Sequence, residues 1–418
     1  MLPSPPTIQP SITSETDLLA QVLVHTPGAE MEMVSPEQRL DLLFDDILYI
    51  DHAQDEHQLM CAVFEKVVGQ AGGVLQVSTL LHEAFEADEA RAAFVTRLCQ
   101  LMPAYNFQAF EADLLKLSPA ELHRFALTGH SPLAIHAPPL PNLMFTRDVC
   151  AVVHDRLILS HAATAARSRE SIIMDVVLHH HEAFAAHRDH VVRLPRGVTF
   201  EGGDLLVVNP TTVLIGHSER TSFSGVMNIA TALFADTPIE HVLMVDIPKE
   251  RSYMHLDTIF TFVSPTECTV FPPLIDQRER GNVVHFQPGE VSGPLRCEIK
   301  PSLKRALEEA LGHPLTFIPC GGPDALNQRR EQWTDGANFF ALAPGVVIGY
   351  ERNTRTFDAM REHGYRIVSA AGFLQYHAES RFTPGEKTAI KLEGTELSRG
   401  RGGPRCMTMP LARTASSP

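Results

Sequence analysis

Several features are scarce in this 418-residue chain, and each scarcity excludes a class of protein. Positive charge is outnumbered: 35 lysines and arginines stand against 50 aspartates and glutamates, for a net charge of -15. Because a nucleic-acid-binding protein needs a basic face, we expect no nucleic-acid partner. No apolar run reaches the length of a membrane-spanning helix, so we expect no membrane segment either.

Cysteine is also sparse. Seven cysteines are scattered along the chain, none of them in CxxC spacing, which favours reduced thiols and a cytoplasmic location. The stretch from Met1 to Pro6 has neither a basic nor an apolar region, so we expect no secretory signal. Neither GxGxxG nor GxxxxGK[ST] occurs, so the sequence predicts no phosphate-cradling loop.

The N-terminal part of the chain predicts little regular structure. Residues 1–20 are rich in Pro, Ser and Thr and are expected to be disordered. Val22–His25 predicts a strand, and Leu43–Ile50 predicts a turn followed by a second strand. These short elements precede a change in pattern.

From residue 56 to residue 128 the apolar positions follow a helical spacing with almost no strand signal. Ser118-Pro119-Ala120-Glu121 combines a cap, a first-turn proline and an acid, which is typical of a helix start. We therefore predict a helical bundle of residues 55–128 inserted into a discontinuous α/β domain of residues 1–54 and 129–418.

A loose repeat follows the helical stretch. An aspartate precedes a β-hairpin four times, with helices expected between the hairpins; the four acids are Asp148, Asp204, Asp257 and Asp335. Repeated units that place an acid at the same end suggest a radial, propeller-like arrangement around a central site. The alternative is an ordinary α/β domain whose hairpins happen to follow acids.

Four clusters carry candidate chemistry, and three of them start a predicted hairpin. The clusters are Asn142–Asp148, Glu201–Asp204, His255–Asp257 and Arg401–Met407. One cysteine with one histidine suggests nucleophilic catalysis, and the arginines beside Cys406 are expected to favour its thiolate. Several carboxylates around them suggest a cationic substrate, and a planar guanidinium pairs well with carboxylates.

Each cluster also has a plainer interpretation. His255 alone is more often a packed core histidine, and Glu201–Asp204 alone is usually a tight turn. Asp148 could form a surface ion pair with Arg147, and the Cys406 segment could be a basic tail. The run His179–His181, with His187 and His190 nearby, is interpreted as a solvated helix face rather than a metal site.

Taken together, seven stretches closely resemble the arginine deiminase family of guanidine-modifying enzymes. They run in the family's order from near Ala20 to the C-terminal region, and they are Phe44–Leu48, Pro141–Asp148, Glu201–Asp204, Ser218–Ser222, Met254–Thr258, Arg330–Asn338 and Arg399–Met407. The resemblance implies a five-bladed pseudo-symmetric α/β propeller of ββαβ units with an inserted helical bundle. It also implies hydrolysis of L-arginine to L-citrulline and ammonia through a covalent cysteine thiouronium.

The resemblance assigns a role to each candidate residue. The nucleophile falls on Cys406, the general acid/base on His255 with Glu201 beside it, and the guanidinium-binding carboxylates on Asp148 and Asp257. The family's α-carboxylate-binding group falls on Asn142, Arg167, Arg220 and Arg401, and Phe145 is a further substrate-binding position. The resemblance implies no cofactor and no metal, and a homo-oligomer.

Some positions depart from the family's pattern. Met144 and Val149-Cys150 differ from the residues expected there, and residues 222–240 and 272–300 match poorly. These departures affect the shape of the pocket and the contacts between subunits. The alternatives are an agmatine deiminase, a dimethylarginine hydrolase or an amidinotransferase, and, from a different class, a catalytically inactive arginine-binding protein.

Overall fold

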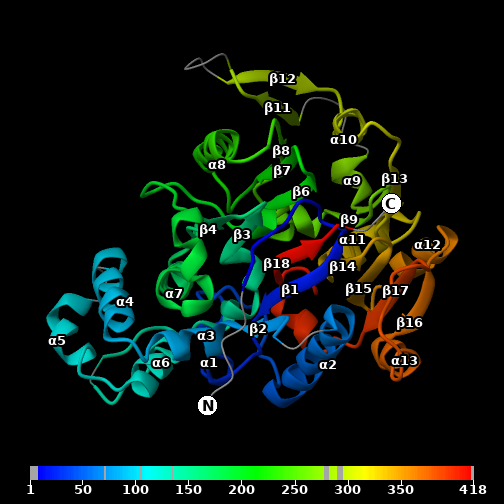
Figure 1. Cartoon of the computed structure of the whole chain (residues 1–418). Helices are drawn as coiled ribbons and strands as arrows, with labels where there is room; N and C mark the ends of the chain where they lie inside the picture. Colours follow the sequence, from blue (N-terminus) through cyan, green and yellow to red (C-terminus); the bar gives the residue numbers. More distant parts are fainter. Residues whose placement is uncertain are drawn as a thin grey trace.

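The computed structural model describes residues 8–69, 72–102, 106–133, 135–276, 282–289 and 295–415. Within these ranges the strands form five separate sheets, and helices lie on the outside of the sheets (Figure 1). None of the described helices is both long enough and apolar enough to cross a membrane. The molecule is therefore a mixed α/β fold built from several small sheets.

The sheets share one topology. In each sheet an antiparallel pair of strands is followed by a third strand that runs parallel to the second. The strands of the four internal units are β3 (Cys150–Val153), β4 (Arg156–Leu159) and β5 (Val191–Val192); β6 (Leu205–Asn209), β7 (Thr212–His217) and β8 (His241–Asp246); β9 (Phe260–Ser264), β10 (Glu267–Val270) and β13 (Thr316–Pro319); and β14 (Phe340–Ala343), β15 (Val346–Tyr350) and β17 (Thr388–Leu392). The four predicted hairpins are confirmed.

The fifth sheet joins the two ends of the chain. Strand β18 (Met409–Thr414) pairs antiparallel with β1 (Leu18–Val24), and β1 pairs parallel with β2 (Val74–Gln76). Figure 1 shows β1 and β18 side by side near the centre of the molecule. The segment before β18 thus occupies the position that an aspartate occupies before the other hairpins.

Helices connect the second and third strands, as the sequence predicts. These are α7 (Ser168–His180), α8 (Phe223–Asp236), α10 (Leu303–Leu311) and α12 (Thr354–Glu362), with α1 (Ala29–Glu32) and α2 (Ile50–Val68) in the terminal unit. Two units carry additions: β16 (Arg366–Ser369) and α13 (Ala370–Tyr376) in one, and α9 (Pro272–Ile275) with the hairpin β11 (Val283–Gln287) and β12 (Arg296–Lys300) in another. That hairpin extends the sheet of β8 rather than its own unit.

Two predictions for the N-terminal part are wrong. The predicted disorder of residues 1–20 fails for residues 8–20, since Ile8 and Ile12 are buried and Ile12 exchanges backbone hydrogen bonds with His154. Residues 1–7 lie outside the described ranges. No second strand forms at Leu43–Ile50, because Leu43 has a left-handed φ of 64° and α2 begins at Ile50.

The helical stretch contributes to two different cores. Helix α2 packs against α13, and its Phe64 contacts Phe340 of β14 edge-on, with 5.5 Å between the ring centroids. The later helices of the stretch lie to one side and share a core with α7 (Figure 1). They are α3 (Val77–Ala84), α4 (Asp88–Leu101), α5 (Glu111–Leu114) and α6 (Pro119–Thr128). The predicted helix start at Ser118 is confirmed as a full capping box with Glu121.

The histidine run at the end of α7 is not wholly a solvated face. His181 is buried, and its Nε2 lies 2.8 Å from Oε2 of Glu83 in α3. His179 contacts Asp175 and Arg193. The prediction of a solvated run is therefore wrong for His181, which helps to join α7 to the helical stretch.

Candidate active site

The acids that precede the hairpins turn inward rather than toward solvent. Three of them end or lie within short 3-10 turns: Thr146–Asp148, Gly202–Asp204 and Leu256–Thr258. All four aspartates of the repeat are buried, including Asp335, which lies just before β14 with a left-handed φ of 62°. The repeated local structure gathers these carboxylates in the interior.

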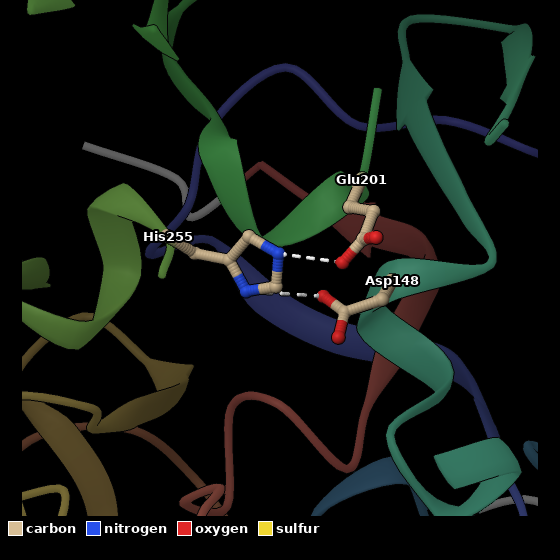
Figure 2. A group of neighbouring side chains, drawn as sticks. All are labelled: Asp148, Glu201 and His255. Atoms are coloured by element: carbon tan, nitrogen blue, oxygen red, sulfur yellow. Dashed lines mark hydrogen bonds and ion pairs between the residues drawn. The ribbon is translucent and has the colours of Figure 1, made fainter. Parts of the chain in front are cut away.

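His255 lies between two carboxylates (Figure 2). Its Nε2 is 2.8 Å from Oε2 of Glu201, and its Nδ1 is 3.6 Å from Oδ1 of Asp148. Gly203 allows this approach, because a Cβ there would lie 2.8 Å from the His255 ring and 2.9 Å from Oδ1 of Asp148. The interpretation of Glu201–Asp204 as a mere tight turn therefore misses its contact with the histidine.

The charges around His255 affect its pKa more strongly than its burial does. Burial alone would lower the pKa of His255, but Asp148, Glu201 and Asp204 raise it to about 10. Burial would likewise raise the pKa of Glu201, yet the hydrogen bond from His255 and the charge of Arg167 lower it to about 2. At neutral pH the pair is an imidazolium and a carboxylate.

Arg167 is bound into the same network. Its Nη1 lies 2.6 Å from Oδ2 of Asp148 and 3.5 Å from Oε2 of Glu201, and its Nε donates to Oε2 of Glu170 at 2.9 Å. Nη2 also donates to the carbonyl of Asn142 at 3.2 Å. Asp148 is thus a buried ion-pair partner of Arg167, and the alternative of a surface pair with Arg147 is wrong.

Cys406 lies on the other side of the site, just before β18. Its backbone N–H donates to Oδ1 of Asn338 at 3.1 Å, and its Sγ is 4.0 Å from Oδ2 of Asp257. Burial raises the pKa of the Cys406 thiol well above its usual range, and the charges of Asp257 and Asp148 add to this effect. The thiol is therefore protonated at neutral pH.

The expectation that neighbouring arginines favour the thiolate is wrong for this arrangement. Arg405 pairs with Asp257 at 2.6 Å and with Glu15 at 3.1 Å rather than with the sulfur. Arg401 instead stacks on Trp333, with 3.3 Å between its Cζ and the ring centroid. Neither guanidinium pairs with the sulfur, so the nearby carboxylates dominate the electrostatic potential at Sγ of Cys406.

The two candidate guanidinium ligands differ in how they are satisfied. Asp148 uses Oδ2 for Arg167, and its Oδ1 accepts the Gly203 N–H at 3.2 Å. Asp257 uses Oδ2 for Arg405, but its Oδ1 is buried without a hydrogen-bond partner. A buried carboxylate oxygen without a donor is unfavourable, which suits a site that receives an N–H from a ligand.

A cavity of about 20 Å³ lies between these side chains. Of the predicted site residues, those that line it are Asn142, Phe145, Asp148, Arg167, Arg220, His255, Arg401 and Cys406. Glu201 and Asp257 contact lining residues from behind. Met144 and Val149 are buried but do not line the cavity, so the departures at these positions do not reach it directly.

Asp148, Glu201 and His255 are also close enough to hold a metal ion, with ligand atoms within 4.8 Å of one another. Their chemistry fits a metal ion poorly. His255 is protonated at neutral pH and offers no free lone pair, and the guanidinium of Arg167 already bonds to Asp148. The three residues form a protonated histidine site rather than a metal centre.

Sequence reasoning missed several residues that shape the site. Asn338 accepts the N–H of Cys406 and donates to the carbonyl of Asp257 at 2.9 Å, so it connects the two. Glu170 supports Arg167, and Asp204 accepts the backbone N–H of Leu256 at 2.8 Å beside His255. Asn338 lies in one of the matching stretches, and Asp204 begins a hairpin, so both carried a usable signal.

Comparisons with known proteins identify the family of this chain. The model of the arginine deiminase family matches residues 40–109 and 107–413. An arginine deiminase of Listeria monocytogenes is 36% identical, with 96% of this chain and 97% of that protein covered; one of Bacillus cereus is 36% identical, with 96% and 98% covered. The amidinotransferase SxtG of Microseira wollei shares the fold at 14% identity, with a TM-score of 0.56 and 98% and 99% coverage. This chain belongs to the arginine deiminase family.

Proposed function

We propose that this protein hydrolyses L-arginine to L-citrulline and ammonia, with Cys406 as the nucleophile. One observation carries the proposal: a cysteine thiol and a histidine imidazolium face one buried cavity that two carboxylates flank. Family membership supports the same reaction. A guanidinium is a poor electrophile, so its hydrolysis needs a strong nucleophile and an acid for the departing amine.

The carboxylates would orient the substrate. The partnerless Oδ1 of Asp257 is available to accept an N–H from a guanidinium, and Asp148 lies across from it beside His255. Their negative charge attracts a cation, and a planar guanidinium can donate to both. This binding would place the guanidinium carbon between the sulfur and the imidazolium.

Substrate charge would also activate the thiol. The carboxylates raise the pKa of Cys406, and a bound guanidinium offsets their charge and so lowers that pKa. The thiol releases its proton to solvent water, the resulting thiolate attacks the guanidinium carbon, and a tetrahedral adduct forms. His255 gives its proton to the departing nitrogen, the carbon–nitrogen bond breaks, and ammonia leaves a thiouronium on Cys406.

In the second half of the reaction, His255 would act as a base instead of an acid. His255, now neutral, takes a proton from water, and the water oxygen attacks the thiouronium carbon. The hydroxyl proton of the adduct passes to the departing sulfur as the carbon–sulfur bond breaks, and citrulline and the Cys406 thiol are released. Glu201 would keep His255 oriented, because its Oε2 lies 2.8 Å from Nε2 of the ring.

The far end of the substrate would meet arginines. Arg220 and Arg401 both line the cavity, and each has a buried Nε without a hydrogen-bond partner. An α-carboxylate would satisfy these donors, and Asn142 and Phe145 line the same cavity. Because the cavity has room for about one water molecule, side chains that line it must move when arginine binds.

We also propose that the five sheets form a five-bladed α/β propeller. The common ββαβ order of the units supports this arrangement, and the segments before β3, β9 and β18 line one cavity. The proposed domain division keeps residues 55–128 as a helical insertion between residues 1–54 and 129–418. Strand β2 and most of helix α2 lie inside that range and belong to the unit of β1, so the insertion would share them with the propeller.

The test is the formation of citrulline and ammonia from L-arginine by the purified protein. Agmatine and methylated arginines are assayed in parallel, since they define the other guanidine-modifying activities. We expect turnover of arginine to exceed that of the other substrates. Binding of arginine without any product would favour a catalytically inactive arginine-binding protein, and faster turnover of agmatine would favour an agmatine deiminase.

A further inference from the structure

Arg401 and Trp333 make the shortest cation–ring contact among the described residues. The guanidinium carbon of Arg401 lies 3.3 Å from the ring centroid of Trp333, whereas the other such distances are 4.8 Å or more. Trp333 ends helix α11 (Ala325–Trp333), is 45% exposed, and is the single tryptophan of the chain. One face of the Trp333 ring therefore contacts Arg401, whose side chain lines the cavity of the site.

The backbone around Arg401 is fixed independently of this contact. Arg401 has a left-handed φ of 63°, and the hydroxyl of Tyr350 donates to the carbonyl of Gly402 at 2.8 Å. A Cβ on Gly402 would lie only 2.3 Å from the ring of Phe145, so this residue packs without spare room. The chain positions Cα of Arg401, and the direction of its side chain depends on the contacts of the guanidinium.

Those contacts leave the guanidinium's edge free. Nε and Nη1 of Arg401 are buried without a hydrogen-bond partner, and Nη1 is 3.8 Å from Oδ2 of Asp45. Stacking on an aromatic ring occupies the flat face of a guanidinium and leaves its N–H groups, which lie in the plane, available. A buried donor edge without a partner fits a planar anionic group, such as a carboxylate.

We propose that Trp333 is a positioning residue, which holds Arg401 so that its free edge receives the α-carboxylate of the substrate. Trp333 thereby contributes to the selection of arginine over an analogue without that carboxylate. This inference rests on the proposed function. It assigns a task to an exposed aromatic side chain outside the reacting groups.

The test compares Trp333→Leu and Trp333→Phe with the wild type, using arginine and agmatine as substrates. We expect Trp333→Leu to raise the KM for arginine about tenfold, because a partly desolvated cation–π contact has about this effect. The kcat for arginine and both constants for agmatine should change less than twofold. Trp333→Phe keeps a ring and should recover about half of the effect on a logarithmic scale.

Tyr376→Leu is the matched control. Tyr376 is another exposed aromatic residue that contacts an arginine, since Cζ of Arg366 lies 4.8 Å from its ring centroid. Tyr376 does not line the cavity. Its loss should leave the KM for arginine unchanged. An unchanged KM in Trp333→Leu, or equal losses for arginine and agmatine, would overturn the proposal while leaving arginine turnover by the wild type intact. Absence of that turnover would instead contradict the proposed function.

Fluorescence tests the contact itself and does not depend on the folding of a Trp333 variant. Because Trp333 is the single tryptophan, the emission spectrum reports its surroundings alone. We expect Arg401→Ala to shift or brighten the emission of the resting protein, whereas Arg366→Ala should not. Superimposable spectra of Arg401→Ala and the wild type would show that the stack is absent in solution and would overturn the proposal.

Discussion

The two sides of the cavity differ in how their charges are satisfied. On the His255 side, the imidazolium has Glu201 and Asp148 as partners, and Arg167 neutralises the carboxylates further. On the Cys406 side, the thiol faces Asp257, which pairs with Arg405 through Oδ2, and Arg401 stacks on Trp333. Both oxygens of Asp148 accept hydrogen bonds, whereas Oδ1 of Asp257 has no hydrogen-bond partner.

This difference explains how one site can hold an acid and a nucleophile at the same pH. The carboxylates that keep His255 protonated also keep Cys406 protonated. A substrate cation would change the balance most on the cysteine side, where Oδ1 of Asp257 has no hydrogen-bond partner. We therefore expect the site to be inert toward thiol reagents until a guanidinium binds, and four predictions test the comparison.

Removal of the nucleophile should have the largest effect. Cys406→Ser should lower kcat by roughly 10⁴-fold or more, on the scale known for loss of a catalytic nucleophile. A hydroxyl has a much higher pKa than a thiol, and the cysteine side offers no strong base. Citrulline release measures turnover, and calorimetry should still detect arginine binding. Turnover near the wild-type rate would remove Cys406 from the nucleophile role.

Substitutions of the two carboxylates should change activity in different ways. Asp148→Asn and Asp257→Asn should each lower kcat/KM by about 10- to 100-fold, since each removes a charge-assisted hydrogen bond worth about 1.5–3 kcal/mol. Asp148 is the strongest contributor to the raised pKa of His255, so only Asp148→Asn should move the alkaline limb of the pH–rate profile to lower pH. Equal pH profiles in both variants would contradict the division of the site into two sides.

Substitutions of Arg220 and Arg401 should change the preference for arginine over agmatine. Arg220→Ala and Arg401→Ala should each change the ratio of kcat/KM for arginine to that for agmatine by at least tenfold, because a buried carboxylate that loses its partner costs about 2–5 kcal/mol. Agmatine lacks the carboxylate and should be affected much less. The ratio is measured for both substrates in each variant, and an unchanged ratio would assign these arginines to the fold alone.

The smallest expected effect concerns stability and pH. The pKa of His255 is raised to about 10 from 6.5, so its contribution is fully present below pH 6.5 and is lost as pH rises through about 10. The pKa of Glu201 is lowered to about 2 from 4.5, so its contribution is present above pH 4.5 and is lost as pH falls through about 2.

Replacement of Glu201 should shift the first of these limits. Glu201→Gln removes a hydrogen-bond acceptor and a negative charge from His255, so the loss of stability on the alkaline side should begin at lower pH than in the wild type. Denaturant unfolding between pH 6 and pH 10 measures the free energy of unfolding in both proteins. Parallel curves would show that Glu201 does not set the protonation of His255.

Much of the fold was predictable from local patterns. The alternation of apolar residues after Asp148, Asp204, Asp257 and Asp335 predicted four hairpins, since strand pairing through a short turn depends on nearby residues. The cap at Ser118 is equally local. The Leu43–Ile50 segment was not predictable in this way, because the N–H of Tyr49 bonds to Glu396, nearly 350 positions later in the chain.

The identity of the site residues was likewise a matter of sequence, whereas their charge states were not. The motifs around Cys406, His255 and Glu201 named the groups that we propose to react, because chemistry of this kind requires those residue types together. Only the tertiary structure decided that Arg405 pairs with Asp257 and Glu15, and that Arg401 stacks on Trp333. A pKa depends on burial and on every charge nearby, and those neighbours come from distant parts of the chain.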